Sequence, residues 1–216
     1  MMPSSFRNPA GPVDSLLSAL GESLRTLSGA VSASRPSPCT DRAAPGSSDD
    51  RTLSAGLMRV NHTGEICAQA LYSGQALVAR DPKVRVALES AAGEERDHLA
   101  WCRERLSDLD ARPSLLDPLW YAGSFAFGVA SGLAGDRWSL GFLSETEAQV
   151  ERHLHGHLER LPADDLGSRQ VVEKMREDEI RHGATGRALG GAELPGPVKA
   201  AMSAASKVMT RTAFRV

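Results

Sequence analysis

The chain has 216 residues, of which 41% are hydrophobic, and this length is enough to bury a sizeable core. Its formal net charge is only −2, and no basic patch interleaved with aromatic residues is present, so no nucleic-acid partner is expected. Ala and Leu are abundant and runs of β-branched residues are absent, which argues against a β-rich fold and predicts an all-α protein.

The three cysteines, Cys39, Cys67 and Cys102, form no Cys-x-x-Cys pair and are odd in number. A disulfide scaffold or a thiolate zinc site is therefore not expected, and the cysteine usage fits a reducing, cytoplasmic compartment. The N-terminus has no basic region followed by an apolar run, so no secretory signal is expected.

The N-terminal segment is predicted to hold one short helix. Residues 1–13 are expected to have no fixed structure, and Asp14 is expected to cap an amphipathic helix. The apolar face of this helix carries Leu16, Leu17, Leu20, Leu24 and Leu27. Such a face packs on the rest of the protein or contacts a membrane or partner, and the sequence leaves both open. Residues 32–50, rich in Ser, Pro, Ala and Asp, are predicted to be a flexible linker, so the main domain is expected to span residues 51–216.

The next two helices are expected at about residues 51–80 and 83–110, separated by a break at Asp81-Pro82. In the first, Glu65 lies on a face of small and aromatic residues. In the second, Glu95 and His98 both fall on the apolar stripe. The spacing of the apolar residues therefore predicts an acid on the buried face of each helix.

The segment 115–134 is strongly apolar, and residues 119–134 carry no charge. This is shorter than the about 20 residues that span a bilayer, so a crossover helix between two helix pairs is predicted. A greasy surface or a channel for an apolar substrate is compatible with the same segment. Four glycines permit close helix packing there: Gly123, Gly128, Gly132 and Gly135.

Two more helices repeat the pattern. The stripe that begins at Leu140 and Leu143 contains one acid, Glu147, and the last stripe contains Glu179 and His182. Beyond Pro197, residues 198–215 form a basic amphipathic helix, which either lies on an anionic membrane surface or docks on the bundle.

The acids and histidines on these stripes predict a metal centre. Glu-x-x-His occurs twice, at Glu95 to His98 and at Glu179 to His182, and an i, i+3 pair points both side chains at one spot. One copy alone is usually a solvated pair, but two copies in register with two lone glutamates fit a carboxylate-bridged pair of metal ions. Such ligands suit iron, manganese or zinc, and divalent cations would relieve the repulsion among four buried acids. The predicted ligands are Glu65, Glu95, His98, Glu147, Glu179 and His182.

Neighbouring polar residues are candidates for holding these ligands by hydrogen bonds. They are His62, Tyr72, Glu151 and His153, and Glu151 also competes with Glu147 as a ligand. Asp97 and Asp178 either orient the histidines or face solvent, and His155 and His157 are expected at the surface. No catalytic residue beyond the metal ligands is predicted.

These motifs resemble those of a known family. The stretch Leu57 to Gln75, with Asn61-His62-Thr63-Gly64-Glu65 at its centre, is similar to the first signature of the demethoxyubiquinone hydroxylases. The stretches Glu94 to His98, Glu145 to Glu151 and Met175 to His182 resemble the others, in the same order and spacing. The resemblance covers about residues 52–216. The chain departs from it at Asn61, where many members have Asp, and at Leu154, where some have Tyr.

The resemblance implies a ferritin-like four-helix bundle with an apolar crossover helix and a C-terminal amphipathic helix. It implies two iron ions held by the six predicted ligands, and ring hydroxylation of a polyprenylated demethoxyubiquinol by O2 in ubiquinone biosynthesis. The expected location is the cytoplasmic face of the bacterial inner membrane, bound peripherally. Other proteins of ubiquinone biosynthesis, or a second copy of the chain, are candidate partners.

Two other functions remain open from the sequence. A ferritin-like ferroxidase or peroxidase uses the same ligand set, but its closed shell would not need the apolar segment 119–134. A non-enzymatic helical interaction protein would use the acids only as surface charges, and it would retain no metal.

Overall fold

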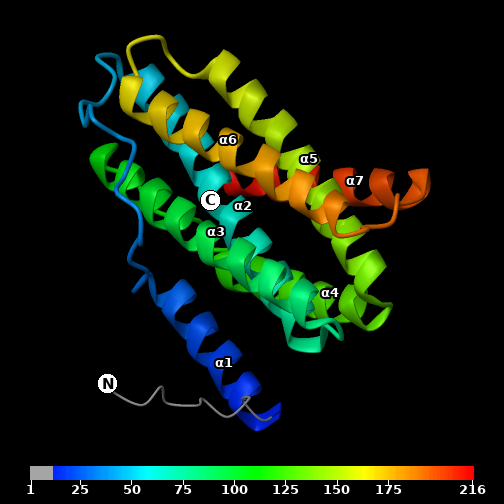
Figure 1. Ribbon diagram of the computed structural model, residues 1–216. Helices are drawn as coiled ribbons and strands as arrows, with labels where there is room; N and C mark the ends of the chain where they lie inside the picture. Colours follow the sequence, from blue (N-terminus) through cyan, green and yellow to red (C-terminus); the bar gives the residue numbers. More distant parts are fainter. Residues whose placement is uncertain (1–11) are drawn as a thin grey trace, which may run out of the picture.

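The computed structural model describes residues 12–216, without the side chains of residues 12–16 and 18–20 (Figure 1). Seven helices and no strand occur in this range. They are α1 (Pro12–Ser28), α2 (Ser48–Val78), α3 (Pro82–Asp108), α4 (Asp117–Leu133), α5 (Asp136–Arg160), α6 (Leu166–Ala188) and α7 (Gly196–Ala213). The all-α fold predicted from the sequence is confirmed.

Four long helices make a ferritin-like bundle. Helices α2 and α3 pack together as one hairpin and α5 and α6 as the other, while α3 meets α6 and α2 meets α5 across the bundle. Local sequence sets the ends of these helices. Asp81 accepts a hydrogen bond from the backbone N–H of Lys83 at 2.8 Å, and Pro82 occupies the first turn of α3. At the start of α6, Asp165 accepts from the N–H of Ser168 at 2.9 Å.

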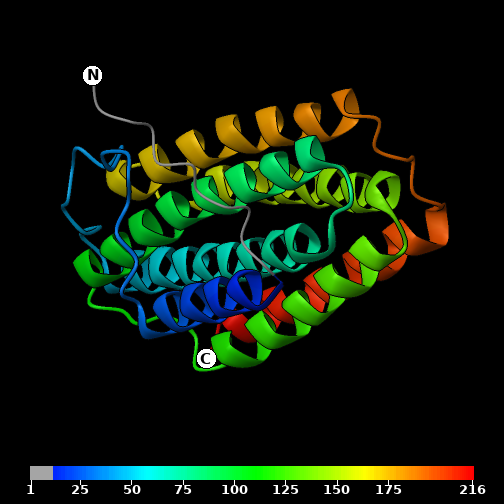
Figure 2. The same cartoon turned by 60° about the horizontal axis from the view of Figure 1, so that its bottom comes forward.

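The crossover helix α4 lies along α2 (Figure 2). Its backbone comes so close that a Cβ placed on Gly128 would lie 2.2 Å from the carbonyl oxygen of Leu71. A Cβ on Gly132 would lie 2.4 Å from Val78. These two glycines therefore permit the close packing predicted from the sequence. In contrast, a Cβ on Gly123 would meet nothing within 4 Å.

The apolar core consists of three clusters of buried side chains. One contains Trp101 and Met175, a second contains Leu88 and Leu140, and a third, smaller one contains Leu99. In each of the four long helices, the predicted ligands lie in sequence between or beside residues of these clusters. The acids are therefore in the middle of the bundle, with apolar layers on both sides.

The N-terminal segment packs on the bundle. Helix α1 begins at Pro12, so Pro12 and Val13 are helical, and the prediction that Asp14 caps this helix is wrong. The expectation for residues 1–11 lies outside the described part of the chain. The segment between α1 and α2 runs beside α3, where the buried Arg105 donates hydrogen bonds to the carbonyl oxygens of Arg42 and Ala43 at 3.1 and 2.8 Å. The division of the chain at residue 50 stays a prediction.

The C-terminal helix α7 packs against α2 and α5. The ring of Phe214, just after α7, fills the space beside Gly56, where a Cβ would lie 2.5 Å from it. Arg59 donates a hydrogen bond to the carbonyl oxygen of Phe214 at 3.0 Å. Among the residues that the structure describes, no helix has the length and apolar character needed to cross a membrane.

Candidate metal centre

Six side chains from four helices meet in the middle of the bundle, and they are the six predicted from the sequence. Their ligand-type atoms form two groups, in each of which all atoms lie within 4.8 Å of one another. The first group is Glu65, Glu95, His98 and Glu179, and the second is Glu95, Glu147, Glu179 and His182. All six residues are buried. That they bind metal stays a prediction at this point.

The two groups share Glu95 and Glu179. Each helix hairpin contributes three residues to one group and one glutamate to the other. A carboxylate has two oxygens, so a residue that belongs to both groups has the chemistry of a bridge between two cations.

Each histidine directs Nδ1 into this cluster. His98 Nδ1 lies 3.0 Å from an oxygen of Glu95 and 3.2 Å from one of Glu179. His182 Nδ1 lies 3.3 Å from Glu95 and 3.5 Å from Glu179. The i, i+3 spacing of each Glu-x-x-His motif thus does what helix geometry predicts: it places both side chains at one spot.

The outer nitrogen of each histidine faces an acid from the opposite hairpin. His98 Nε2 lies 3.1 Å from Oδ2 of Asp178, and His182 Nε2 lies 3.4 Å from Oε2 of Glu94. Asp178 and Glu94 each immediately precede the glutamate of a Glu-x-x-His motif. A carboxylate on the outer nitrogen fixes the orientation of an imidazole whose other nitrogen binds a metal.

The electrostatics of the cluster are those of acids forced together. Burial, followed by the charge of Glu95, raises the pKa of Glu65 well above its ordinary value. Burial, followed by the charge of Glu179, does the same to the pKa of Glu147. For Glu95 burial alone would raise the pKa, but the close contacts of its carboxylate with the imidazoles of His182 and His98 outweigh burial and lower the pKa. The cluster therefore contains two acids whose ionised form is disfavoured, Glu65 and Glu147. It also contains Glu95, whose ionised form is stabilised by the neighbouring histidines.

These residues fit a pair of divalent cations. Several buried atoms of the cluster have no hydrogen-bond partner within the described residues: Oε1 of Glu95, Oε2 of Glu147, both carboxylate oxygens of Glu179 and both ring nitrogens of His182. Unpartnered buried acceptors are costly, and a bound cation would satisfy them. Oxygen and imidazole donors without thiolates suit iron or manganese as well as zinc.

Of the four neighbouring residues singled out by the sequence, one touches a predicted ligand. Tyr72 donates a hydrogen bond to Oε1 of Glu147 at 2.6 Å. His62 instead faces Asp117, at 3.2 Å between Nδ1 and Oδ2. Glu151 belongs to neither ligand group. The ring of His153 packs on that of His157, with centroids 3.9 Å apart.

Two further expectations are corrected by the structure. The sequence predicts His157 at the surface, but its side chain is buried, because it lies at the edge of the apolar stripe of α5 and the packing of neighbouring elements covers it. His155 is exposed, as expected. Asp97 does not orient a histidine, because its carboxylate accepts hydrogen bonds from Ser34 and Arg35 of the N-terminal segment.

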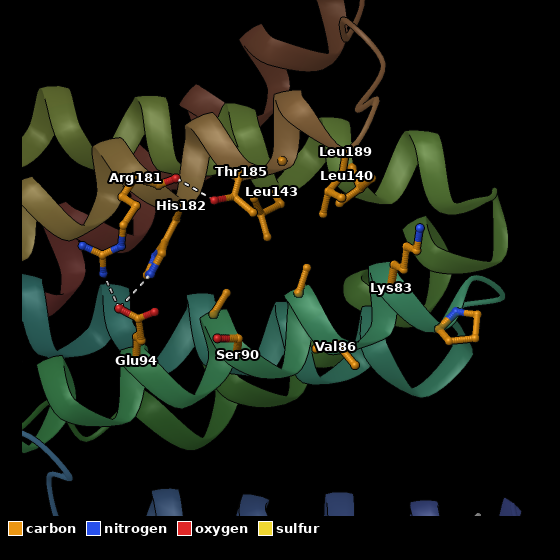
Figure 3. A pocket seen from close by; sticks show the side chains of 14 residues that line it. Lys83, Val86, Ser90, Glu94, Leu140, Leu143, Arg181, His182, Thr185 and Leu189 are labelled. Atoms are coloured by element: carbon orange, nitrogen blue, oxygen red, sulfur yellow. Dashed lines mark hydrogen bonds and ion pairs between the residues drawn. The ribbon is translucent and has the colours of Figure 1, made fainter.

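A cleft of about 660 Å³ opens from the surface toward His182, between α3, α5 and α6 (Figure 3). At the end of the cleft near His182, Glu94 reaches across to both His182 and Arg181, as the dashed lines in Figure 3 mark. Leu140 and Leu143 form part of the apolar wall. No role for Glu94 was predicted from the sequence. Its position just before Glu95 matches that of Asp178 just before Glu179, and this repeat could have indicated the same role for both acids.

A second cavity of about 790 Å³ reaches the cluster from another side and ends at Glu65. It lies between α2, α4, α5 and α7 and is lined mainly by apolar side chains. Phe127 and Phe142 pack edge to face within its wall, with ring centroids 5.0 Å apart. Asn61, Trp120 and His153 also line it, and each has a buried polar atom without a hydrogen-bond partner among the described residues.

Comparison with known proteins agrees with this arrangement. Residues 52–213 match the model of the family described as ubiquinone biosynthesis protein COQ7. This chain belongs to the COQ7 family. The 3-demethoxyubiquinol 3-hydroxylase of Ralstonia pickettii is 53% identical over an alignment of 216 residues. The match covers 94% of this chain and 100% of that protein. The protein of the same name from Cupriavidus necator is 56% identical over 208 residues, covering 94% and 100%, and that from Bordetella pertussis is 54% identical over 213 residues, covering 98% and 96%.

The part of the chain that matches the COQ7 family contains all six clustered residues and the crossover helix α4. The N-terminal segment with α1 and Arg35 lies before the match. The near-complete overlap with the relatives nevertheless includes much of this segment.

Proposed function

We propose that this member of the COQ7 family is a di-iron monooxygenase that hydroxylates the ring of a polyprenylated demethoxyubiquinol with O2, in ubiquinone biosynthesis. One observation carries the proposal: two four-residue groups share Glu95 and Glu179, and Glu65 of the first group lines an apolar cavity. The names of the relatives give the ring position and the class of substrate.

Glu65, Glu95, His98, Glu147, Glu179 and His182 would hold two iron ions. When bound and reduced, such a pair supplies the electrons and open positions that activate O2. The protein's own contribution is to orient the ligands through Tyr72, Asp178 and Glu94, and to exclude water with the apolar layers on both sides.

The apolar cavity fits the shape and chemistry of a prenylated quinol. Its long apolar walls suit a polyprenyl tail, and its inner end brings a ring close to Glu65. Oδ1 of Asn61, Nε1 of Trp120 and Nε2 of His153 would meet the oxygens of the ring, since buried polar atoms are usually paired.

A substrate with such a tail resides in a membrane, so we include peripheral binding to the cytoplasmic face of the bacterial inner membrane in the proposal. Exposed apolar side chains on α1 and α4 support it: Leu24 is 72% exposed and Leu119 is 66% exposed. Ser23 of α1 and Tyr121 of α4 lie 2.8 Å apart through their hydroxyl oxygens, which links these two helices. Another ubiquinone-biosynthesis protein or a second copy of the chain is a further candidate partner for this surface.

The first test combines metal content with turnover. Protein produced with iron-57 is expected to hold about two irons per chain, with a coupled diferric Mössbauer signal, and to hydroxylate a demethoxyubiquinol. Glu147→Ala is expected to lose that coupled signal and the activity while it keeps its helical circular dichroism. Wild-type protein with no bound iron would overturn the metal centre. Two irons with oxidation of Fe(II) but no quinol hydroxylation would instead favour a ferroxidase or peroxidase.

Membrane binding has its own test. Wild-type protein is expected to float with anionic lipid vesicles, and the double variant Leu24→Glu, Leu119→Glu is expected to stay at the bottom of the gradient. The pair Val86→Glu, Ile180→Glu, at exposed apolar positions of α3 and α6, is the matched surface control because it changes the charge by the same amount. A wild-type protein that does not float would contradict the peripheral location.

A further inference from the structure

Arg35 lies outside the four-helix bundle in sequence but reaches the acids behind the candidate metal centre. It belongs to the segment between α1 and α2, before the residues that match the COQ7 family. Its Nε donates to Oδ2 of Asp97 at 2.6 Å, and its Nη1 donates to Oδ2 of Asp178 at 2.7 Å. One planar guanidinium thus connects carboxylates from α3 and α6.

The contact with Asp178 falls on the oxygen that also faces a candidate ligand. His98 Nε2 lies 3.1 Å from that same Oδ2. Asp178 is fully buried, and its other oxygen is paired with Lys174 at 3.1 Å and Arg181 at 2.9 Å. Of these three cations, Arg35 is the one on the oxygen shared with the histidine. It therefore determines where that oxygen sits relative to the imidazole.

Arg35 also lies near the corresponding acid of the other hairpin. Its Nη1 is 3.7 Å from Oε2 of Glu94, the carboxylate that faces His182. The acids behind both histidines are thus within reach of one side chain, although the shorter contact is to Asp178.

The segment that carries Arg35 is also held in place by contacts that involve neither Asp178 nor Glu94. Next to it, Ser34 donates from its backbone N–H to Asp97 at 2.6 Å. Farther along, the buried Arg105 donates hydrogen bonds to the backbone carbonyl oxygens of Arg42 and Ala43. The guanidinium of Arg35 lies over the Trp101 ring, 4.9 Å from its centre, in a cation–π contact. These contacts hold the guanidinium in position.

We propose that Arg35 is a positioning residue for the metal centre: it holds the Asp178 carboxylate against His98 and so fixes the imidazole for metal binding. The N-terminal segment is then a functional part of the site. This inference rests on the proposed function only in that the cluster binds metal.

The test measures cobalt(II) binding by spectroscopic titration of the full chain, without turnover. Four variants are compared with wild type: Arg35→Gln, Arg35→Lys, Asp178→Asn and the double variant Arg35→Gln, Asp178→Asn. Arg42→Gln is the matched control, because it removes an arginine of the same segment that pairs only with exposed or partly exposed acids of α3. Thermal unfolding of each metal-free variant reports any loss of stability.

Arg35→Gln is expected to weaken cobalt(II) binding about 10- to 100-fold, the range typical for residues that orient metal ligands. Arg35→Lys is expected to restore part of this loss, because one ammonium replaces the charge but cannot contact both acids in the same geometry. Arg42→Gln is expected to bind as wild type does. In the Asp178→Asn background, Arg35→Gln is expected to have no further effect on binding, because both substitutions act through the same contact between Arg35 and Asp178.

The proposal would be overturned by an Arg35→Gln variant that binds cobalt(II) within about twofold of wild type, or by one whose loss is as large in the Asp178→Asn background. Equal losses in Arg35→Gln and Arg42→Gln would assign the effect to the segment as a whole and also overturn it. If wild-type protein binds no cobalt(II), the proposed metal centre itself fails. The two failures are therefore distinguishable.

Discussion

The residues behind the two histidines differ, although their geometry repeats. Asp178 is fully buried and paired with three cations, whereas the side chain of Glu94 is 29% exposed at the end of the cleft in Figure 3. The surroundings of His98 are therefore dry and fixed, and those of His182 are open to small molecules from the cleft. We expect the two metal positions to differ in affinity and in exchange with solvent for this reason.

The sharing of Glu179 by both groups leads to a prediction about metal stoichiometry. Glu179→Ala removes an oxygen ligand from both positions, whereas Glu65→Ala removes one only from the group around His98. We expect Glu179→Ala to retain almost no iron and Glu65→Ala to retain about one iron per chain, measured by elemental analysis after gel filtration. Equal retention by the two variants would show that Glu179 does not bridge.

The hydrogen bond between Tyr72 and Glu147 should stabilise the metal-free fold. Tyr72→Phe leaves a buried carboxylate without its donor, and we expect it to lower the free energy of unfolding by about 1–3 kcal/mol in urea. Tyr121→Phe is the matched control, because Tyr121 contacts Ser23 in a half-buried place and should cost less. The opposite order would contradict the role given to Tyr72.

The half-buried His153 and the buried His157 should make the protein sensitive to mild acid. Burial, together with the charge of Arg160, lowers the pKa of His153 from 6.5 to about 4. Burial, His153 and Arg160 lower the pKa of His157 from 6.5 to about 2. Both rings are neutral in the folded chain and take up protons on unfolding below pH 6.5. The stability they contribute is therefore complete above that pH and is lost as the pH falls toward the folded-state values.

Each pH unit below 6.5 is expected to cost about 1.4 kcal/mol per such histidine, or about 2–4 kcal/mol for the pair between pH 7 and pH 5. Urea unfolding at several pH values measures this slope. His157→Gln should flatten it, while the exposed neighbour variant His155→Gln should not. A slope unchanged by His157→Gln would contradict the assignment.

At this scale the sequence predicted which side chains meet but not what surrounds them. Periodicity placed Glu65, Glu147 and both Glu-x-x-His pairs on inward faces, because helix spacing alone determines that. Glu94 and Arg35 could not be found in the same way, since their roles depend on how separate segments pack. His157 was misjudged because it lies at the edge of a stripe, where neighbouring helices decide burial.

Among the helices, α4 lies close to α2 because glycines, which have no side chain, occupy the contact between them. The close approach of Gly128 to Leu71 lets the two backbones touch, while Gly123 faces the apolar cavity. The same residue type therefore has opposite roles on one helix.

Alanine substitutions should separate these roles. Gly128→Ala places a methyl against the Leu71 backbone and is expected to destabilise the protein by about 1–3 kcal/mol. Gly123→Ala meets nothing within 4 Å and is expected to stabilise α4 by about 0.5–1 kcal/mol through higher helix propensity. Thermal or urea unfolding measures both. Two changes of the same sign would contradict the packing of α4 on α2.

The long helices and the crossover helix followed from apolar periodicity and from Asp81-Pro82 in the sequence. The segment 32–50 did not: its composition is that of a linker, yet it carries Ser34, Arg35 and Arg42 to specific acids on the bundle. Polar side chains that make long-range ion pairs have no periodic signal, so composition alone misjudges such a segment.

For the whole molecule, the cluster couples metal binding to folding. Four buried acids repel one another without cations, so a metal that binds only the folded chain should stabilise it. At a free metal concentration about 100 times the dissociation constant, one site adds about 2.7 kcal/mol, which for a chain of this length raises Tm by about 5–10 °C. Scanning calorimetry with Fe(II) or Co(II), with and without a chelator, measures the shift. Glu179→Ala should show almost none.

The sharing of Glu95 and Glu179 by the two groups has a consequence for how the two helix hairpins assemble. A chain cut in the turn after α4 would leave three of the six residues on each fragment, and neither fragment would hold a complete four-residue group. Metal retention would then report the reunion of the fragments. The equal division of the six residues between the two hairpins also fits an origin from two copies of one helix pair. These copies would first have dimerised to form the site and would later have been joined by α4.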